Sequence, residues 1–180
     1  TNINTTAVTS TGTQTYGDDD GTDTITLGVD TTLTALTVTF NAPIVGQAHS
    51  LAITGNAVFG DSTGDDIATG LASLAVSGTT AMYMSAITST GAQTYGDTDG
   101  TDTITLGADT TLTALDSGST VTFNAPLKGE AHSLDVIGNA VFGDATGDDT
   151  ATDLARLTVT GTTNINTTAV TSTGTQTYGD

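Results

Sequence analysis

Residues 22–43 read TDTITLGVDTTLTALTVTFNAP, and this stretch decides the fold class of the chain. In it a single aliphatic residue repeatedly stands between two threonines, as Ile25 does between Thr24 and Thr26. Successive side chains of a strand point to opposite faces, so the aliphatic residue faces one way and both threonines face the other. Gly28 and Pro43 mark the turns that separate these runs. The stretch therefore predicts short strands with aliphatic side chains pointing inward.

The same pattern recurs along the whole chain, because residues 7–85 align with residues 86–168. The only length change is a four-residue insertion, Asp116 to Ser119. Runs of brief strand character are expected at 22–28, 37–40, 49–55, 56–60 and 73–78, and in the second copy at 101–107, 120–123, 132–138, 139–143 and 156–161.

The first and the last eighteen residues of the chain, 1–18 and 163–180, are identical, as in a window onto a repeat array. We expect residues 1–6 to end a preceding repeat, residues 7–85 and 86–168 to form two long repeats, and residues 169–180 to begin another. Units that contact mainly their neighbours build elongated molecules that serve as scaffolds, spacers or repeated binding surfaces.

Two all-β architectures could use these strands. The first is a repetitive β-solenoid resembling a parallel β-helix, with coils of about 20 residues and corners rich in Gly and Asp. The second is a tandem array of β-sandwich modules, which would need more strands per module and a linker. The short strands favour the solenoid, in which each long repeat is expected to form about four coils and to rise about 19 Å. An insertion at a corner would leave the stacked strands in register.

Composition limits the partners that the chain can have. It carries 20 acidic residues against Lys128 and Arg156, a formal net charge of −18, and no cysteine. A nucleic-acid partner needs a basic footprint and an anionic membrane surface needs a polybasic patch, so neither is expected. An apolar span that would insert directly into a membrane is also missing. Dissolved cations are the natural partners of such a chain.

Most of the negative charge lies in one motif, an aromatic residue followed by Gly-Asp-x-x-Gly-x-Asp. It occurs as YGDDDGTD at 16–23, FGDSTGDD at 59–66, YGDTDGTD at 95–102 and FGDATGDD at 142–149. The aromatic residue is expected to pack at a corner. The candidate metal ligands in these loops are Asp18, Asp20, Asp23, Asp61, Asp65, Asp66, Asp97, Asp99, Asp102, Asp144, Asp148 and Asp149.

Calcium is the expected ligand of these acidic loops. Two carboxylates about 4 Å apart repel by about 1 kcal/mol in water and about 4 kcal/mol at an effective dielectric constant of 20, so a bridging cation would stabilise the loop. Calcium accepts six to eight oxygen ligands in a flexible geometry. The run from Gly100 to Thr105 also resembles the second half of the calcium-binding nonapeptide of RTX β-rolls. Alternatively, Asp and Gly simply form turns on a solvated corner.

Other chemistry is less well supported by the sequence. His49 and His132 occupy equivalent positions, and only Glu130 stands near one of them, so a structural role is expected for both. The acidic pairs repeat along the chain, whereas a catalytic site needs a single cleft with converging groups, so no enzyme is expected. The Thr-x-Thr triplets leave a second function open, because such triplets form the flat faces of ice-binding solenoids when they occur once per coil.

The phrases STGxQTYGD, DTTLTAL, TVTFNAP, GNAVFGD and LxVxGTT recur through the chain. Together they resemble the β-strand repeats of giant bacterial extracellular proteins, the group that contains filamentous-haemagglutinin-like adhesins. This resemblance implies a structural segment of a secreted or cell-surface filament or adhesin shaft. It also implies neighbouring copies as partners, joined within one chain or end to end, and leaves open a repetitive surface that binds ice or glycan.

Overall fold

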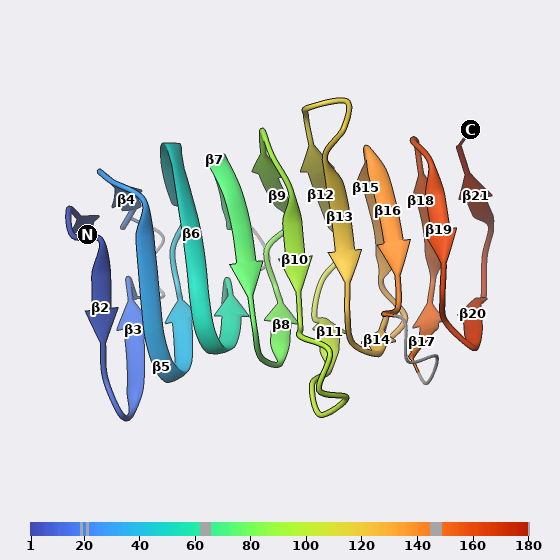
Figure 1. The fold of residues 1–180 in the computed structure, drawn as a ribbon, viewed down its shortest axis with the longest axis horizontal. Helices are drawn as coiled ribbons and strands as arrows, with labels where there is room; N and C mark the ends of the chain where they lie inside the picture. The colour runs from blue at the N-terminus through green and yellow to red at the C-terminus, as the bar shows by residue number, and fades with distance from the viewer. Residues whose placement is uncertain (19, 21, 62–65, 145–148, 180) are drawn as a thin grey trace.

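A computed structural model describes residues 1–18, 20, 22–61, 66–144 and 149–179. The described residues form strands, turns and loops without a helix, and the strands stack in parallel as a β-solenoid. Figure 1 shows the stack extending from the N-terminus at one end to the C-terminus at the other. None of the described residues belongs to a helix that could span a membrane. The expected β-solenoid is confirmed, and the tandem-sandwich alternative is wrong.

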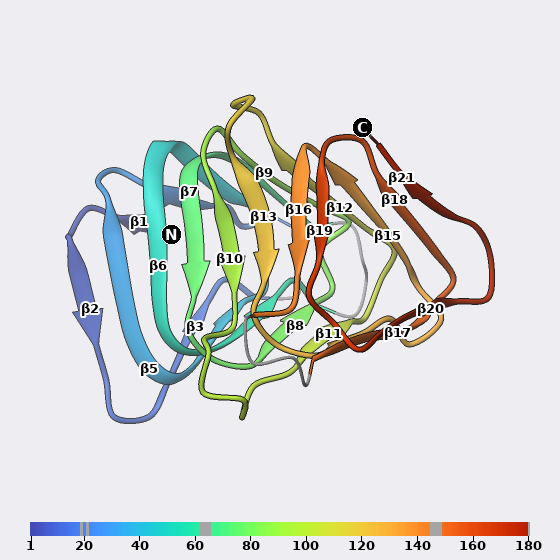
Figure 2. The same cartoon turned by 45° about the vertical axis from the view of Figure 1, so that its right-hand side comes forward.

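Each turn of the solenoid has three faces, which follow one another in chain order. Figure 2 shows the stacked turns obliquely. The first face is defined by the register partners Ile25, Ile44, Ala68, Ile87 and Leu112, and continues through Val136 and Val159. The second runs from Val8 through Leu33, Ile53, Val76, Tyr95, Phe123 and Phe142. The third runs from Gln14 through Val38, Ala57, Thr80, Ile104 and Leu127 to Ala151.

Each of the shorter strands lies on a single face, whereas three longer strands bend around corners and lie on two or three faces. The long strands are β5 (Thr31–Phe40), β6 (Ile44–Phe59) and β7 (Ile67–Val76). The first face holds β1 (Asn2–Ile3), β4 (Ile25–Leu27), β9 (Ala86–Ser89), β12 (Thr110–Ala114), β15 (Ser133–Ile137), β18 (Arg156–Val159) and β21 (Gln176–Tyr178). The second holds β2 (Ala7–Thr9), β10 (Gln93–Tyr95), β13 (Thr120–Phe123), β16 (Asn139–Phe142) and β19 (Thr163–Ile165). The third holds β3 (Thr13–Tyr16), β8 (Thr80–Met82), β11 (Ile104–Leu106), β14 (Leu127–Lys128), β17 (Thr150–Leu154) and β20 (Ala169–Ser172).

The core is a narrow column of aliphatic and aromatic side chains inside the three faces. Ile25, Leu33 and Val38 are completely buried, and the threonines beside them are half-buried or exposed. Burial therefore alternates with a period of two, as the Thr-aliphatic-Thr runs predict. Because every turn adds a similar layer, the core is continuous from one long repeat to the next, without a linker.

The long repeat does not contain a whole number of turns. We count as one segment each part of a strand that lies on one face. From β4 to β10 there are eleven segments, because β5 contributes two, β6 three and β7 two. From β11 to β21 there are also eleven, one for each strand. Eleven segments on three faces make three and two-thirds turns, so the two long repeats make about seven turns together. The expectation of about four coils per repeat therefore exceeds the observed number by only one third of a turn. Because the corners differ in length, so do the turns, which range from 19 residues between Ile25 and Ile44 to 28 residues between Tyr95 and Phe123. The number of residues alone therefore does not give the number of turns.

The inserted residues Asp116 to Ser119 lie in the corner between β12 and β13, which projects from the upper edge of the stack in Figure 1. After the insertion, Thr120 pairs with Asn139 and Val121 with Ala140. These pairs repeat the register of the first copy, in which Thr37 pairs with Asn56 and Val38 with Ala57. The insertion lengthens a corner and leaves the strand register unchanged, as expected.

Candidate cation site at the acidic corners

The four acidic loops lie at corners of the solenoid. Residues 16–23 and 59–66 lead from the third face to the first, whereas residues 95–102 and 142–149 lead from the second face to the third. Each loop follows a strand whose last residue is aromatic. The corner that carries the motif therefore changes between the first and the second long repeat.

The aromatic residue of each motif anchors its corner from inside. Tyr95 and Phe142 are fully buried on either side of Phe123, with ring centroids 5.9 Å and 5.0 Å from it. In the first copy, Tyr16 and Phe59 stack on Phe40 at 5.7 Å and 5.4 Å. Such offset aromatic pairs add to the stabilisation that burial provides. The predicted packing role of the aromatic residues is confirmed.

The glycine that follows the aromatic residue turns the chain outward into the loop. Gly96 has φ +77°, and a Cβ there would lie 2.8 Å from the Cβ of Ala125 in the next turn. Gly17, Gly60 and Gly143 have φ of +78°, +81° and +81°. Only glycine adopts this conformation without strain while leaving room for the neighbouring turn. The corner is therefore fixed by an aromatic-glycine pair before the first aspartate is reached.

The loop at 95–102 brings three carboxylates together. One ligand oxygen from each of Asp97, Asp99 and Asp102 lies within 4.8 Å of the others, the one such acidic group among the described residues. Asp102 Oδ2 accepts a hydrogen bond from the Asp97 amide at 3.2 Å, and Asp97 Oδ1 accepts one from the Asp99 amide at 2.9 Å. The amide and the hydroxyl of Thr101 donate to Asp99 Oδ1 at 2.9 Å and 2.7 Å. These bonds hold the three side chains on one side of the turn.

The environment of these carboxylates shifts their pKa values in opposite directions. Burial and the charges of Asp97 and Asp99 raise the pKa of Asp102 above its usual value. Hydrogen bonds from Thr101 lower the pKa of the exposed Asp99. In the first copy the hydrogen bonds from Thr22 lower the pKa of Asp20, and interactions with Asp20 raise that of Asp18. A cation bound beside Asp102 would oppose the burial and the charge repulsion that raise this pKa.

The other loops share part of this geometry. Asp149 Oδ2 accepts a 2.9 Å hydrogen bond from the Asp144 amide, which matches the bond between Asp102 and Asp97. Asp66, Asp144 and Asp149 are all buried, and Asp61 is half-buried. Asp18, Asp20 and Asp23 lie in the loop between β3 and β4 and do not form a group like that of Asp97. Asp65 and Asp148 lie outside the described residues.

The two histidines occupy equivalent positions in the two repeats, and each contacts an aspartate of the preceding turn. His49 Nδ1 is 3.5 Å from Asp30 Oδ1, and His132 Nδ1 is 3.6 Å from Asp109 Oδ1. The amide after each histidine donates to the same aspartate oxygen, at 2.8 Å from Ser50 and 2.7 Å from Ser133. These contacts link consecutive turns and agree with a structural role.

A buried polar network was missed by sequence reasoning. Gln93 is completely buried, and its amide donates to the carbonyls of Ile87 and Thr113 and to the hydroxyl of Ser89. Its carbonyl accepts the hydroxyl of Tyr95 at 2.8 Å. The signal was the recurrence of STGxQTY, because in the other two copies Tyr16 and Tyr178 also donate to the glutamine two residues earlier. The motif ties one turn to the next from inside the core.

The Thr-x-Thr triplets are divided among the three faces. In the first copy the triplets beginning at Thr24, Thr32 and Thr37 lie on the first, second and third faces. In the second copy the equivalent triplets, which begin at Thr103, Thr111 and Thr120, lie on the third, first and second faces. Consequently no described face carries the one-triplet-per-coil array that an ice-binding surface needs.

Comparison of the chain with protein-family models finds no match, and comparison with curated proteins and with solved structures finds none either. The interpretation of the chain therefore rests on its own sequence and geometry. The resemblance to filamentous-haemagglutinin-like repeats remains a prediction.

Proposed function

We propose that the chain is a structural segment of a secreted or cell-surface filament or adhesin shaft, without catalytic activity. The observation that carries this proposal is the continuity of the core, because two long repeats join in one solenoid of about seven turns with no linker between them. Each added repeat would lengthen the stack by the same contacts. Such quasi-one-dimensional proteins serve as spacers and as extended surfaces. Neighbouring copies of the repeat are the natural partners.

The shaft is further proposed to bind calcium at its acidic corners. The grouping of Asp97, Asp99 and Asp102 supports this, since carboxylate oxygens are the ligands that calcium prefers. The resemblance of the repeats to those of bacterial adhesins supports the proposal of an extracellular or cell-surface location. A location where calcium reaches millimolar concentration would suit sites of modest affinity.

Thermal unfolding followed by circular dichroism, in excess calcium and then in chelator, tests the calcium proposal. At a calcium concentration of 100 times Kd, one site adds about 2.7 kcal/mol. This raises the Tm of a chain of this length by roughly 5–10 °C. The triple variant Asp97→Asn, Asp99→Asn, Asp102→Asn should lose most of this rise. The control is Asp116→Asn, which removes an exposed charge in the inserted corner and should leave the response unchanged. An equal Tm in calcium and chelator would refute calcium binding while leaving the shaft proposal intact.

The pH dependence in chelator provides a second test at the same loop. The pKa of Asp102 is higher in the folded chain than in the unfolded chain, so protonated Asp102 favours the folded state. Its contribution to the free energy of unfolding is complete below the unfolded pKa of about 3.8 and is lost as the pH rises through the folded pKa. Asp102→Asn should therefore raise the Tm at pH 7 in chelator and lower it in calcium. The Asn side chain can still accept the hydrogen bond from the Asp97 amide. A variant that is destabilised equally in both conditions would contradict a cation site at this loop.

A further inference from the structure

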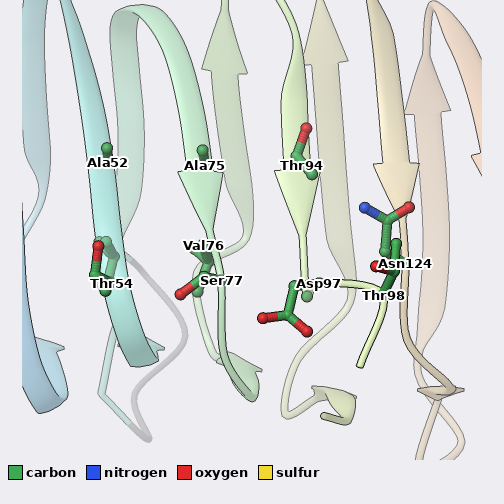
Figure 3. A pocket seen from close by; sticks show the side chains of 11 residues that line it. Ala52, Thr54, Ala75, Val76, Ser77, Thr94, Asp97, Thr98 and Asn124 are labelled. Carbon is green, nitrogen blue, oxygen red and sulfur yellow. The ribbon is translucent and has the colours of Figure 1, made fainter. Parts of the chain in front are cut away.

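A shallow groove of about 400 Å³ lies across the second face, beside the acidic loop at 95–102. Figure 3 shows Ala52, Ala75 and Thr94 in one row on β6, β7 and β10, with Asp97 just beyond the end of β10. The row agrees with the strand register, which pairs Ala52 with Ala75 and Ala75 with Thr94. The small side chains of Ala52 and Ala75, on two adjacent turns, thus form a shallow depression in the sheet surface next to the loop at 95–102.

The two ends of the groove differ in chemistry. At one end the floor is made by the methyl groups of Ala52 and Ala75, and at the other the lining includes the carboxylate of Asp97. Asp99 and Asp102 add their negative charge beside Asp97. An occupant that matches both ends has an aliphatic stem and a cationic head. The chain itself offers only two such side chains, Lys128 and Arg156.

The second long repeat shows a side chain of this kind at the equivalent place. There Ala52, Ser73 and Ala75 are replaced by Asp135, Arg156 and Thr158. Arg156 donates to Asp135 Oδ2 at 2.7 Å and to Thr158 Oγ1 at 2.9 Å. The positions that form the groove floor in the first repeat are therefore bonded to a cationic side chain in the second. The first repeat, in contrast, has no charged side chain at positions 52, 73 and 75.

We propose that the groove of the first repeat binds a partner polypeptide, whose aliphatic atoms lie over Ala52 and Ala75 and one of whose basic side chains reaches Asp97. The partner is a Lys- or Arg-containing extended segment, which could run along the groove over successive turns. This site shares Asp97 with the calcium proposal, so calcium and the basic side chain would compete for that carboxylate. The floor at Ala52 and Ala75 belongs to the sheet surface and takes no part in calcium binding.

The test is a titration of the full chain with a tetralysine peptide by NMR, in chelator and at moderate salt, so that calcium binding plays no part. The decisive variant is the double substitution Ala52→Asp, Ser73→Arg, which installs the ion pair of the second repeat over the groove. It adds one negative and one positive charge, so the net charge of −18 and the general attraction for a polycation are unchanged. We expect shifts centred on residues 52, 75 and 94 in the wild type, and at least tenfold weaker binding by the double variant. Equal affinity for both proteins would overturn the proposal.

Two single variants and one modified peptide complete the test. Asp97→Asn should weaken tetralysine binding several-fold, and Asp116→Asn, which removes one charge far from the groove floor, should not. Equal losses in the two variants would show that attraction is only general and would overturn the proposal. A tetralysine peptide with acetylated side chains should not bind, and undiminished binding of that peptide would show that the occupant is not cationic. A melting curve for each variant confirms that the solenoid is intact.

Discussion

The two long repeats have nearly the same sequence, yet each motif lies on a different face in the two copies. Leu33 of the first repeat is on the second face, whereas its equivalent, Leu112, is on the first. The aromatic residues move in the same way, since Phe59 is on the third face and Phe142 on the second. The same segments fit different faces because each face offers the same environment, a buried aliphatic row with threonines outside. The sequence thus specifies the order of strands and corners and not a particular side of the shaft.

This shift determines how the surface of a longer shaft would be arranged. A repeat of eleven segments moves each motif by two faces, so the motif returns to its face after three long repeats, or eleven turns. At about 4.8 Å per turn this distance is about 53 Å. Acidic corners therefore follow one another around the shaft and do not line one side. Such a surface suits ligands that approach from every direction, including dissolved cations.

The largest expected difference between the repeats concerns Gly55 and its equivalent, Gly138. Both have a positive φ, +118° and +127°, which strains any residue with a Cβ. A Cβ on Gly55 would overlap the carbonyl oxygen of Ala35, whereas one on Gly138 would lie 2.9 Å from that of Ala114. We expect Gly55→Ala to lower the free energy of unfolding by about 4 kcal/mol and Gly138→Ala by about 2 kcal/mol, measured by chemical denaturation.

The inserted corner offers a physical reason for this difference, because Asp116 to Ser119 give the chain after Ala114 a longer path. Deleting these four residues from the second repeat should make Gly138→Ala as costly as Gly55→Ala. If the two glycine variants instead cost the same in the full chain, the corners would be mechanically equivalent and the insertion would have no effect on packing.

A smaller difference is expected between Tyr95 and Tyr178, which end the same STGxQTY motif in different surroundings. Tyr95 is fully buried and Tyr178 is 37% exposed, although both hydroxyls donate to a glutamine. Tyr95→Phe leaves the buried carbonyl of Gln93 without this donor and should cost about 2 kcal/mol. Tyr178→Phe should change stability by less than about 0.5 kcal/mol, because water can replace its hydroxyl. Equal effects would show that the Gln93 carbonyl finds another donor.

The two tyrosines should also differ in their effect on the loss of stability at alkaline pH. Burial raises the pKa of Tyr95 above its ordinary value of 10.0, so the folded chain holds this phenol neutral while the unfolded chain ionises it. The corresponding stability is complete below about pH 10 and is lost as the pH rises further. Tyr95→Phe should therefore flatten the loss of Tm above pH 10, and Tyr178→Phe should flatten it less.

The strand pattern and the candidate loops could be predicted from the sequence, but the number of turns and the face on which each strand lies could not. The alternation around Ile25 and the position of Tyr95 before Gly96 were sufficient to predict burial, because both depend on local geometry. The number of turns depends on corner lengths, which vary with residues that leave no periodic signal. The gathering of Asp97, Asp99 and Asp102 was expected from their spacing, whereas the role of Gln93 required the neighbouring turn to be seen. Polar side chains in a core are identified by their partners, and those partners are distant in sequence.

The last comparison concerns one corner at which the repeats use different residues for the same backbone conformation. Asp153 has φ +58°, and its equivalent in the first repeat is Gly70, with φ +66°. A Cβ on Gly70 would meet only ordinary contacts, the nearest at 3.5 Å, so the exchange isolates the backbone preference. Asp153→Gly should raise the free energy of unfolding by about 0.5–1 kcal/mol, and Gly70→Asp should lower it by a similar amount. Asp153→Asn separates the loss of charge from the backbone term, because Asn also tolerates this conformation. A gain in Asp153→Asn equal to that in Asp153→Gly would assign the effect to charge repulsion within this acidic chain and not to the left-handed backbone.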